Sequence, residues 1–86
     1  MCETKEKNIP CNLDIHIVKA GWFKYKIYTV FYNQHGENYA QGEETAFTVR
    51  EASVIVRNNI FWAMAKRYIK RDCIHVINHT NKYIKY

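Results

Sequence analysis

The sequence is short of cysteine, proline, glycine and long apolar runs. It holds three cysteines, one proline and three glycines in 86 residues. An odd number of cysteines at irregular spacing does not fit a disulfide scaffold, so we expect reduced thiols. Residues 1–8 lack the apolar segment of a secretory signal, and no run reaches the roughly 18 apolar residues of a membrane span. These absences predict a cytoplasmic protein with no membrane partner.

Motifs of catalysis and of cofactor binding are also missing. The chain has no glycine-rich phosphate loop and no nucleophile in a recognisable motif. Its four histidines are scattered, as they are in ordinary soluble domains. We therefore expect a protein that is not an enzyme, that has no catalytic residues and that needs no cofactor.

A metal site is the nearest alternative. Cys73, His75 and His79 are separated by even numbers of residues and would project to one side of an extended strand, and Cys11 would add a fourth ligand. On a straight strand of about 3.3 Å per residue, however, residues 75 and 79 lie roughly 13 Å apart, too far to share one ion. Only a turn at Asn78 would bring them together. We adopt the simpler interpretation of a buried thiol and surface histidines, with no metal.

What is present is the composition of one small globular domain. Hydrophobic residues make up 48% of the chain and aromatic residues 15%, which is enough to build a core from large side chains. A chain of this length holds one core. Residues 1–10 combine charge with the proline, so we expect a flexible arm there and a single domain over residues 11–86.

Alternating and β-branched residues predict three strands. The first spans about 14–21, the second 22–32 and the third about 39–47. The polar loop 33–38 contains Gly36 where a positive φ is needed, which indicates a hairpin. Gly42 and the two glutamates after it weaken the third strand, as expected of an edge strand or a bulge. In the second strand the predicted core face is Phe23, Tyr25, Ile27, Thr29 and Phe31.

Thr48 and Glu51 have the spacing of a capping box, which predicts the start of a helix. No proline or glycine interrupts the run to about Lys70, where we expect the helix to end. A strand over 73–78 and a short final run over 83–86 complete the chain. The predicted fold is α+β: a small two-layer sandwich of an antiparallel sheet and one long helix, in the order β-β-β-α-β with an optional last strand.

The outward face of the second predicted strand interleaves cations with aromatic rings, a combination that neutralises phosphate and stacks on bases. The net charge of +5 favours anionic partners. Alternatively, lysine and tyrosine merely suit a half-exposed strand, and the cations near the helix end merely face its dipole. The candidate residues for partner or nucleic-acid binding are Trp22, Lys24, Lys26, Tyr28, Tyr32, Lys66, Arg67, Lys70 and Arg71.

The helix carries two apolar stripes at about 100° per residue. One stripe, which suits the sheet, contains Val49, Ala52, Val56, Ile60 and Ala63. The opposite one needs a partner, which would be a second copy in a homodimer, another protein, or the final hairpin or N-terminal arm of the same chain. Its residues are Val54, Phe61, Ala65 and Tyr68.

Several features spread over residues 25–83 carry a family resemblance: Tyr28 and Val30, the loop around Gly36, Glu51-Ala52, Ala63-Met64-Ala65-Lys66 and His75-Val76-Ile77. The arrangement resembles small β-β-α-β proteins of phages and mobile elements, among them some type I anti-CRISPR proteins. The resemblance implies a stoichiometric inhibitor that covers a functional surface of a host protein or ribonucleoprotein complex. This chain departs from the acidic DNA mimics of that group, so its target would be an acidic patch, a guide RNA or a protein groove.

The alternative is a small nucleic-acid-binding module. Three strands followed by a helix also look like the arm-site DNA-binding domains of phage integrases, which lay their sheet in a groove. Salt-sensitive binding to bare nucleic acid, lost when Lys24 and Lys26 become glutamate, would distinguish the module from the inhibitor.

Overall fold

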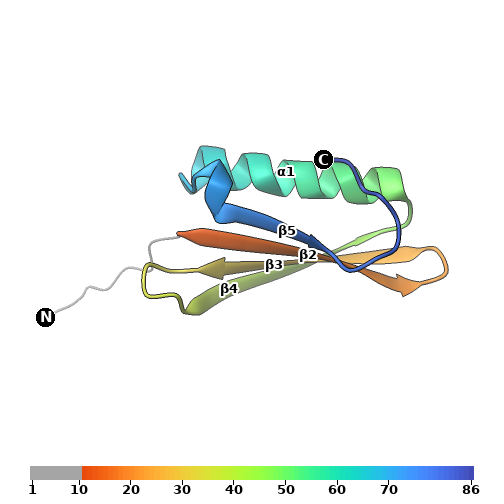
Figure 1. The fold of residues 1–86 in the computed structure, drawn as a ribbon, viewed down its shortest axis with the longest axis horizontal. Helices are drawn as coiled ribbons and strands as arrows, with labels where there is room; N and C mark the ends of the chain where they lie inside the picture. Colours follow the sequence, from red (N-terminus) through yellow and green to blue (C-terminus); the bar gives the residue numbers. More distant parts are fainter. Residues whose placement is uncertain (1–10) are drawn as a thin grey trace, which may run out of the picture.

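The computed structural model describes residues 11–86, so the arm expected over residues 1–10 lies outside the described part. Its sheet has the strand order β4-β3-β2-β5, and α1 covers one face of it (Figure 1). The predicted α+β fold and the order β-β-β-α-β are confirmed. The elements are β2 (Asn12–Gly21), β3 (Lys24–Tyr32), β4 (Asn38–Ala46), α1 (Val49–Lys66), η1 (Arg71–Cys73) and β5 (Ile74–Asn78).

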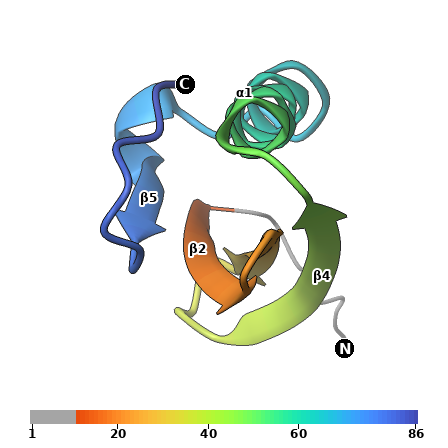
Figure 2. The ribbon, with the colours of Figure 1, turned by 90° about the vertical axis from the view of Figure 1, so that its right-hand side faces the viewer.

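The sheet is mixed, whereas the sequence predicted an antiparallel one. β2, β3 and β4 pair antiparallel, but β5 joins β2 in parallel. The cause is α1, which carries the chain back along the sheet before β5 begins, so β5 runs in the direction of β4 and β2. Figure 2 shows the sheet curled around the helix, with β5 on one side and β4 on the other. The concave face holds the core, and we call the other face of the sheet the convex face.

Alternation along the strands places the core as predicted, with one exception. Ile27 and Thr29 of β3 are buried and Phe31 is half-buried against the core. Phe23 is 75% exposed. Gly21 pairs with Lys24, so Trp22 and Phe23 form a two-residue turn and belong to neither strand. Because the aromatic residues of the second predicted strand continue through this turn, the sequence pattern did not indicate a turn there.

The start of α1 confirms the capping box in outline. The Thr48 hydroxyl accepts a hydrogen bond of 3.0 Å from the Glu51 amide. The Glu51 carboxylate accepts one of 2.8 Å from the Phe47 amide, one residue before the amide expected. The first bond satisfies a backbone donor that the first helical turn leaves without a partner, and the second fixes the chain just before the helix.

The helix ends at Lys66, four residues earlier than predicted. Tyr68 has φ of 58°, and the Ile69 amide donates to the Ala63 carbonyl at 3.2 Å. Ile69 is buried in the core. This is the arrangement of a helix C-terminus closed by a left-handed residue and an apolar contact, with tyrosine where glycine is usual.

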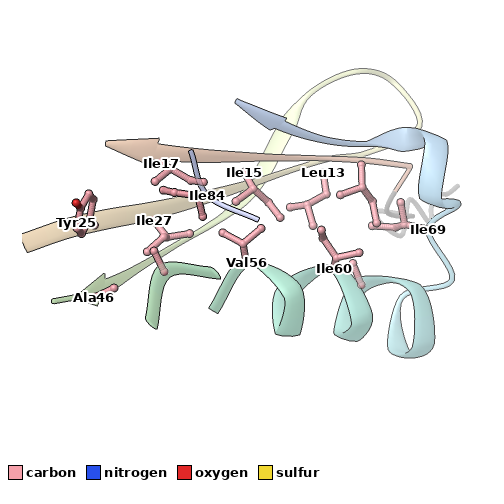
Figure 3. Close-up of a cluster of buried hydrophobic side chains, with 13 residues drawn as sticks. Leu13, Ile15, Ile17, Tyr25, Ile27, Ala46, Val56, Ile60, Ile69 and Ile84 are labelled. Atoms are coloured by element: carbon pink, nitrogen blue, oxygen red, sulfur yellow. The ribbon is translucent and has the colours of Figure 1, made fainter. Parts of the chain in front are cut away.

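The core lies between α1 and the concave face of the sheet (Figure 3). The four buried residues of α1 belong to the first predicted stripe, and small Ala52 and Ala63 let the helix approach closely. Ile84 joins this cluster from the end of the chain. Residues 83–86 are therefore not a strand as predicted; they run along α1, where the Ser53 hydroxyl donates to the Lys85 carbonyl.

Two glycines have clear structural reasons. Gly36 has φ of 79° in the β3–β4 loop, as its position predicted. Gly42 lies on edge strand β4 opposite Thr29, and a Cβ there would be 2.7 Å from the Thr29 hydroxyl oxygen. The absence of a side chain lets the curled edge strand approach β3.

Candidate interaction surfaces

Four candidate residues of the second strand do share the convex face. Lys24, Lys26, Tyr28 and Tyr32 alternate with the buried positions of β3, and α1 lies on the other side of the sheet. Lys24 and Tyr28 are exposed, while Tyr32 is half-buried. This part of the predicted surface therefore exists as a row along β3.

Register adds carboxylates to the same face. Asp14 on β2 and Glu43 on β4 both occupy outward positions beside β3. Glu43 pairs with Lys26 at 2.6 Å, and this hydrogen bond to the carboxylate raises the pKa of the Lys26 ammonium. The face thus carries two lysines and two carboxylates, of which Lys26 and Glu43 form an ion pair, and the sum of these four charges is zero. A face of this kind attracts phosphate weakly.

A shallow hollow lies at the centre of the convex face. Its volume is about 330 Å³, and three strands together with His79 line it. Nδ1 of His16 and Nε2 of His79 are 3.0 Å apart at its rim. The His79 amide donates to the Ile17 carbonyl at 2.8 Å, which extends the β2–β5 pairing by one residue. These contacts hold the chain after β5 against the sheet.

The remaining candidate residues do not lie on this face. Trp22 lies in the β2–β3 turn at one end of the molecule, where α1 begins, and α1 ends at the other (Figure 1). Lys24 and Phe31 are seven residues apart on β3, or about 23 Å, and Phe31 meets Trp62 of the last turns of α1 at 6.3 Å between ring centroids. The nine candidates therefore form no single surface. Those that lie near the end of α1 are Lys66, Arg67, Lys70 and Arg71.

The second apolar stripe of α1 faces away from the sheet. Phe61 is 70% and Val54 is 38% exposed, and Ala65 is also exposed. Tyr68 is 85% exposed but lies beyond the helix rather than on it, because α1 ends early. We call Val54, Phe61 and Ala65, with the flanking Arg50 and Arg57, the outer helix face.

The end of the chain packs beside this face. Tyr83 and Lys85 line a hollow with Ser53 and Val54, at the start of α1. Phe61 lies two turns further along the helix and is not part of that hollow. Among residues 11–86, the C-terminal run thus flanks the outer helix face and leaves Phe61 exposed.

An aromatic cluster near the end of α1 was not predicted from the sequence. Trp62 meets Phe31 edge-on, and the Arg67 guanidinium lies 4.8 Å from the centre of the Trp62 ring. Tyr39 contacts Phe31 from β4, and burial raises the pKa of its hydroxyl while the charge of Arg67 opposes the rise. Trp62 lies between the two apolar stripes of the helix, so the helical periodicity of the sequence did not indicate a contact there.

The histidines and cysteines are dispersed. Cys73 packs half-buried against the core, His75 is exposed on β5, and His79 contacts His16. In the described residues no three His, Cys, Asp or Glu side chains are grouped so that they could hold a metal ion. Within residues 11–86 no helix has the length and apolar character to cross a membrane.

No family model matches this chain, and neither the curated proteins nor the solved structures yield a match. We therefore base the functional proposal on the surfaces described above.

Proposed function

We propose that this chain is a non-enzymatic binding protein that docks onto another protein through the outer helix face. The observation that carries the proposal is the exposure of Phe61, at 70%, on the side of α1 that folding does not use. Val54 and Ala65 extend the apolar stripe on either side of it. Phe61 and Ala65 are one turn apart, and an exposed apolar patch with polar residues around it is typical of protein interaction sites.

The charge around this stripe favours an acidic partner. Arg50 and Arg57 flank it, and in the described part of the chain neither forms an ion pair with a carboxylate. Glu51, the carboxylate in the first turn of α1, already accepts from the Phe47 amide. Association of two copies through this face would bring like charges together, whereas an acidic surface would complement them. These charges support a different protein over a homodimer.

The mode of action we propose is stoichiometric: the bound chain covers a functional surface of a host macromolecular complex. This mode of action is what the resemblance to small phage and mobile-element inhibitors implies. The net charge of +5 favours an acidic patch as the target surface. Lys26 and Tyr39 have shifted pKa values, but an ion pair and burial account for them. Neither shift requires a catalytic role.

The nucleic-acid alternative has less support. The convex face has aromatic rings on β3, but Asp14 and Glu43 offset its two lysines. A module that binds a phosphate backbone needs a surplus of cations along its path. The outer helix face has such a surplus, but it lacks a row of exposed rings for stacking.

A capture experiment with surface variants tests the proposal. The immobilised wild type, Phe61→Asp and Tyr28→Asp are exposed to a lysate of the host, and the bound proteins are quantified. We expect the wild type and Tyr28→Asp to recover one partner in a one-to-one ratio and Phe61→Asp to lose it. Recovery that depends on Tyr28 and not on Phe61 would move the binding site to the convex face. Because Phe61 is 70% exposed, Phe61→Asp should melt like the wild type. Tyr28→Asp places a carboxylate opposite Glu43 and should melt somewhat lower, so retention of the partner by this less stable variant makes it a strict control.

A further inference from the structure

The turn between β2 and β3 has an unusual composition. Residues 19–24 are all exposed, and Trp22 and Phe23 at its tip are 87% and 75% exposed. Two-residue hairpin loops ordinarily carry Asn-Gly or similar small residues. The two rings also diverge, with centroids 6.5 Å apart and planes at 58°, so they shield each other little. Nothing in the geometry of the turn calls for two large aromatic side chains.

The turn projects from one end of the molecule, where it would be the first part to contact another surface. The turn lies at one end of the long axis of the molecule (Figure 1). Tyr25 is the first buried residue behind it on β3. On β3 only Lys24 stands between Tyr25 and the two turn residues, so at about 3.3 Å per residue the tip projects about 7 Å beyond Tyr25. The tip is therefore a narrow convex projection.

The charges that β2, β3 and their turn carry beside the tip have one sign. From Ile15 to Gly36 the chain contains no aspartate or glutamate. Lys19 and Lys24 flank the tip on its two strands, and the Lys19 ammonium lies 5.6 Å from the centre of the Tyr25 ring. The next cation, Lys26, is already paired with Glu43. The order from the tip inwards is thus aromatic rings first and unpaired positive charge behind.

We infer that the Trp22-Phe23 turn inserts into the surface of an anionic lipid bilayer, with Lys19 and Lys24 against the lipid phosphates. The projection of about 7 Å lies within the depth of roughly 5–10 Å to which interfacial elements enter the headgroup region. Trp prefers that region, and lysine is attracted to anionic headgroups. This surface is separate from the outer helix face, so the inference does not depend on the proposed function.

The turn differs both from a membrane-spanning segment and from a surface that binds a nucleic-acid duplex. The expectation of no membrane partner came from the lack of a spanning segment, which a turn that enters only the interface does not need. A nucleic-acid duplex fits the turn less well, because two lysines are too few to follow a phosphate backbone. A duplex is nevertheless retained as a control ligand.

Vesicle co-sedimentation provides the test. The chain has two tryptophans, so a Trp62→Phe variant leaves Trp22 as the single fluorescent reporter. We expect this variant to sediment with vesicles of phosphatidylcholine and phosphatidylserine, with a blue shift of Trp22 emission, and to remain free with phosphatidylcholine alone. Replacing Lys19 and Lys24 by glutamine should weaken the partition about fivefold for each lysine. Added salt should weaken it as well.

Matched variants identify the responsible residues. Trp22→Ser/Phe23→Ser should abolish sedimentation with the anionic vesicles, whereas Phe61→Ser, which also removes an exposed ring, should leave it unchanged. Both variants should keep the circular dichroism of the wild type. Absence of sedimentation at low salt, or equal sedimentation of the Trp22→Ser/Phe23→Ser variant, would overturn the inference. Binding to a short DNA duplex that requires Trp22, without vesicle binding, would assign the turn to nucleic acid instead.

Discussion

Nδ1 of His16 and Nε2 of His79 face each other across 3.0 Å, joining the middle of β2 to the chain that follows β5. The ring centroids are 5.3 Å apart and the planes differ by 13°. Since the centroid separation equals the N···N distance plus a ring radius at each end, the rings lie edge to edge rather than stacked. One nitrogen must then donate its hydrogen and the other accept it.

This contact should contribute to stability. It joins β2 to the chain that follows β5, so its loss should loosen the attachment of that chain to the sheet.

Replacing His79 by alanine tests this expectation. In urea unfolding at neutral pH, His79→Ala should lower the free energy of unfolding by about 1 kcal/mol, because the hydrogen bond between the rings is lost. His35→Ala, in the exposed β3–β4 loop, serves as the control and should behave like the wild type. Equal stability of His79→Ala and the wild type would show that the contact between the rings does not hold the chain to the sheet.

Two substitutions at Tyr68 distinguish an effect on stability from an effect on binding. Its φ of 58° is costly for tyrosine and free of cost for glycine, so Tyr68→Gly should raise the free energy of unfolding by about 1 kcal/mol. Tyr68→Ala removes the same exposed ring but keeps the strained backbone, so its stability should stay near that of the wild type. If Tyr68 contacts the partner, both variants bind less tightly. A destabilised Tyr68→Gly would contradict the helix ending described here.

The last residues of the chain should contribute to stability although they form no strand. Ile84 is buried in the core, whereas its neighbour Tyr83 is 83% exposed. Ile84→Ala should lower the free energy of unfolding by about 2–3 kcal/mol, measured in urea. Tyr83→Ala, the matched control, should change it by less than about 0.5 kcal/mol. Similar effects at both positions would mean that the C-terminal run does not pack along α1.

Local patterns predicted those elements whose signals are contained in a few neighbouring residues. Alternation around Ile15 and the capping residues Thr48 and Glu51 indicated a strand and a helix start, and both are present. The turn at Trp22 was missed because aromatic residues there continue a strand pattern. The helix end was missed because tyrosine, at position 68, occupies the place usual for glycine.

Properties of the surfaces depend on register, which a single chain does not reveal. Lys26 looked like part of a basic row, but pairing of β3 with β4 places Glu43 beside it. Asp14 reaches the same face from β2. By contrast, the exposure of Phe61 followed from helical periodicity alone, because both stripes lie on one element.

Site-specific photocrosslinking tests most directly the claim that the outer helix face binds a protein partner. A benzophenone side chain replaces Phe61 in one variant and Tyr28 in another, and each is irradiated in the host lysate. We predict that the variant at position 61 forms a covalent one-to-one adduct with an acidic protein and that the variant at position 28 does not. An adduct at position 28 alone, or no adduct at position 61, would contradict this account.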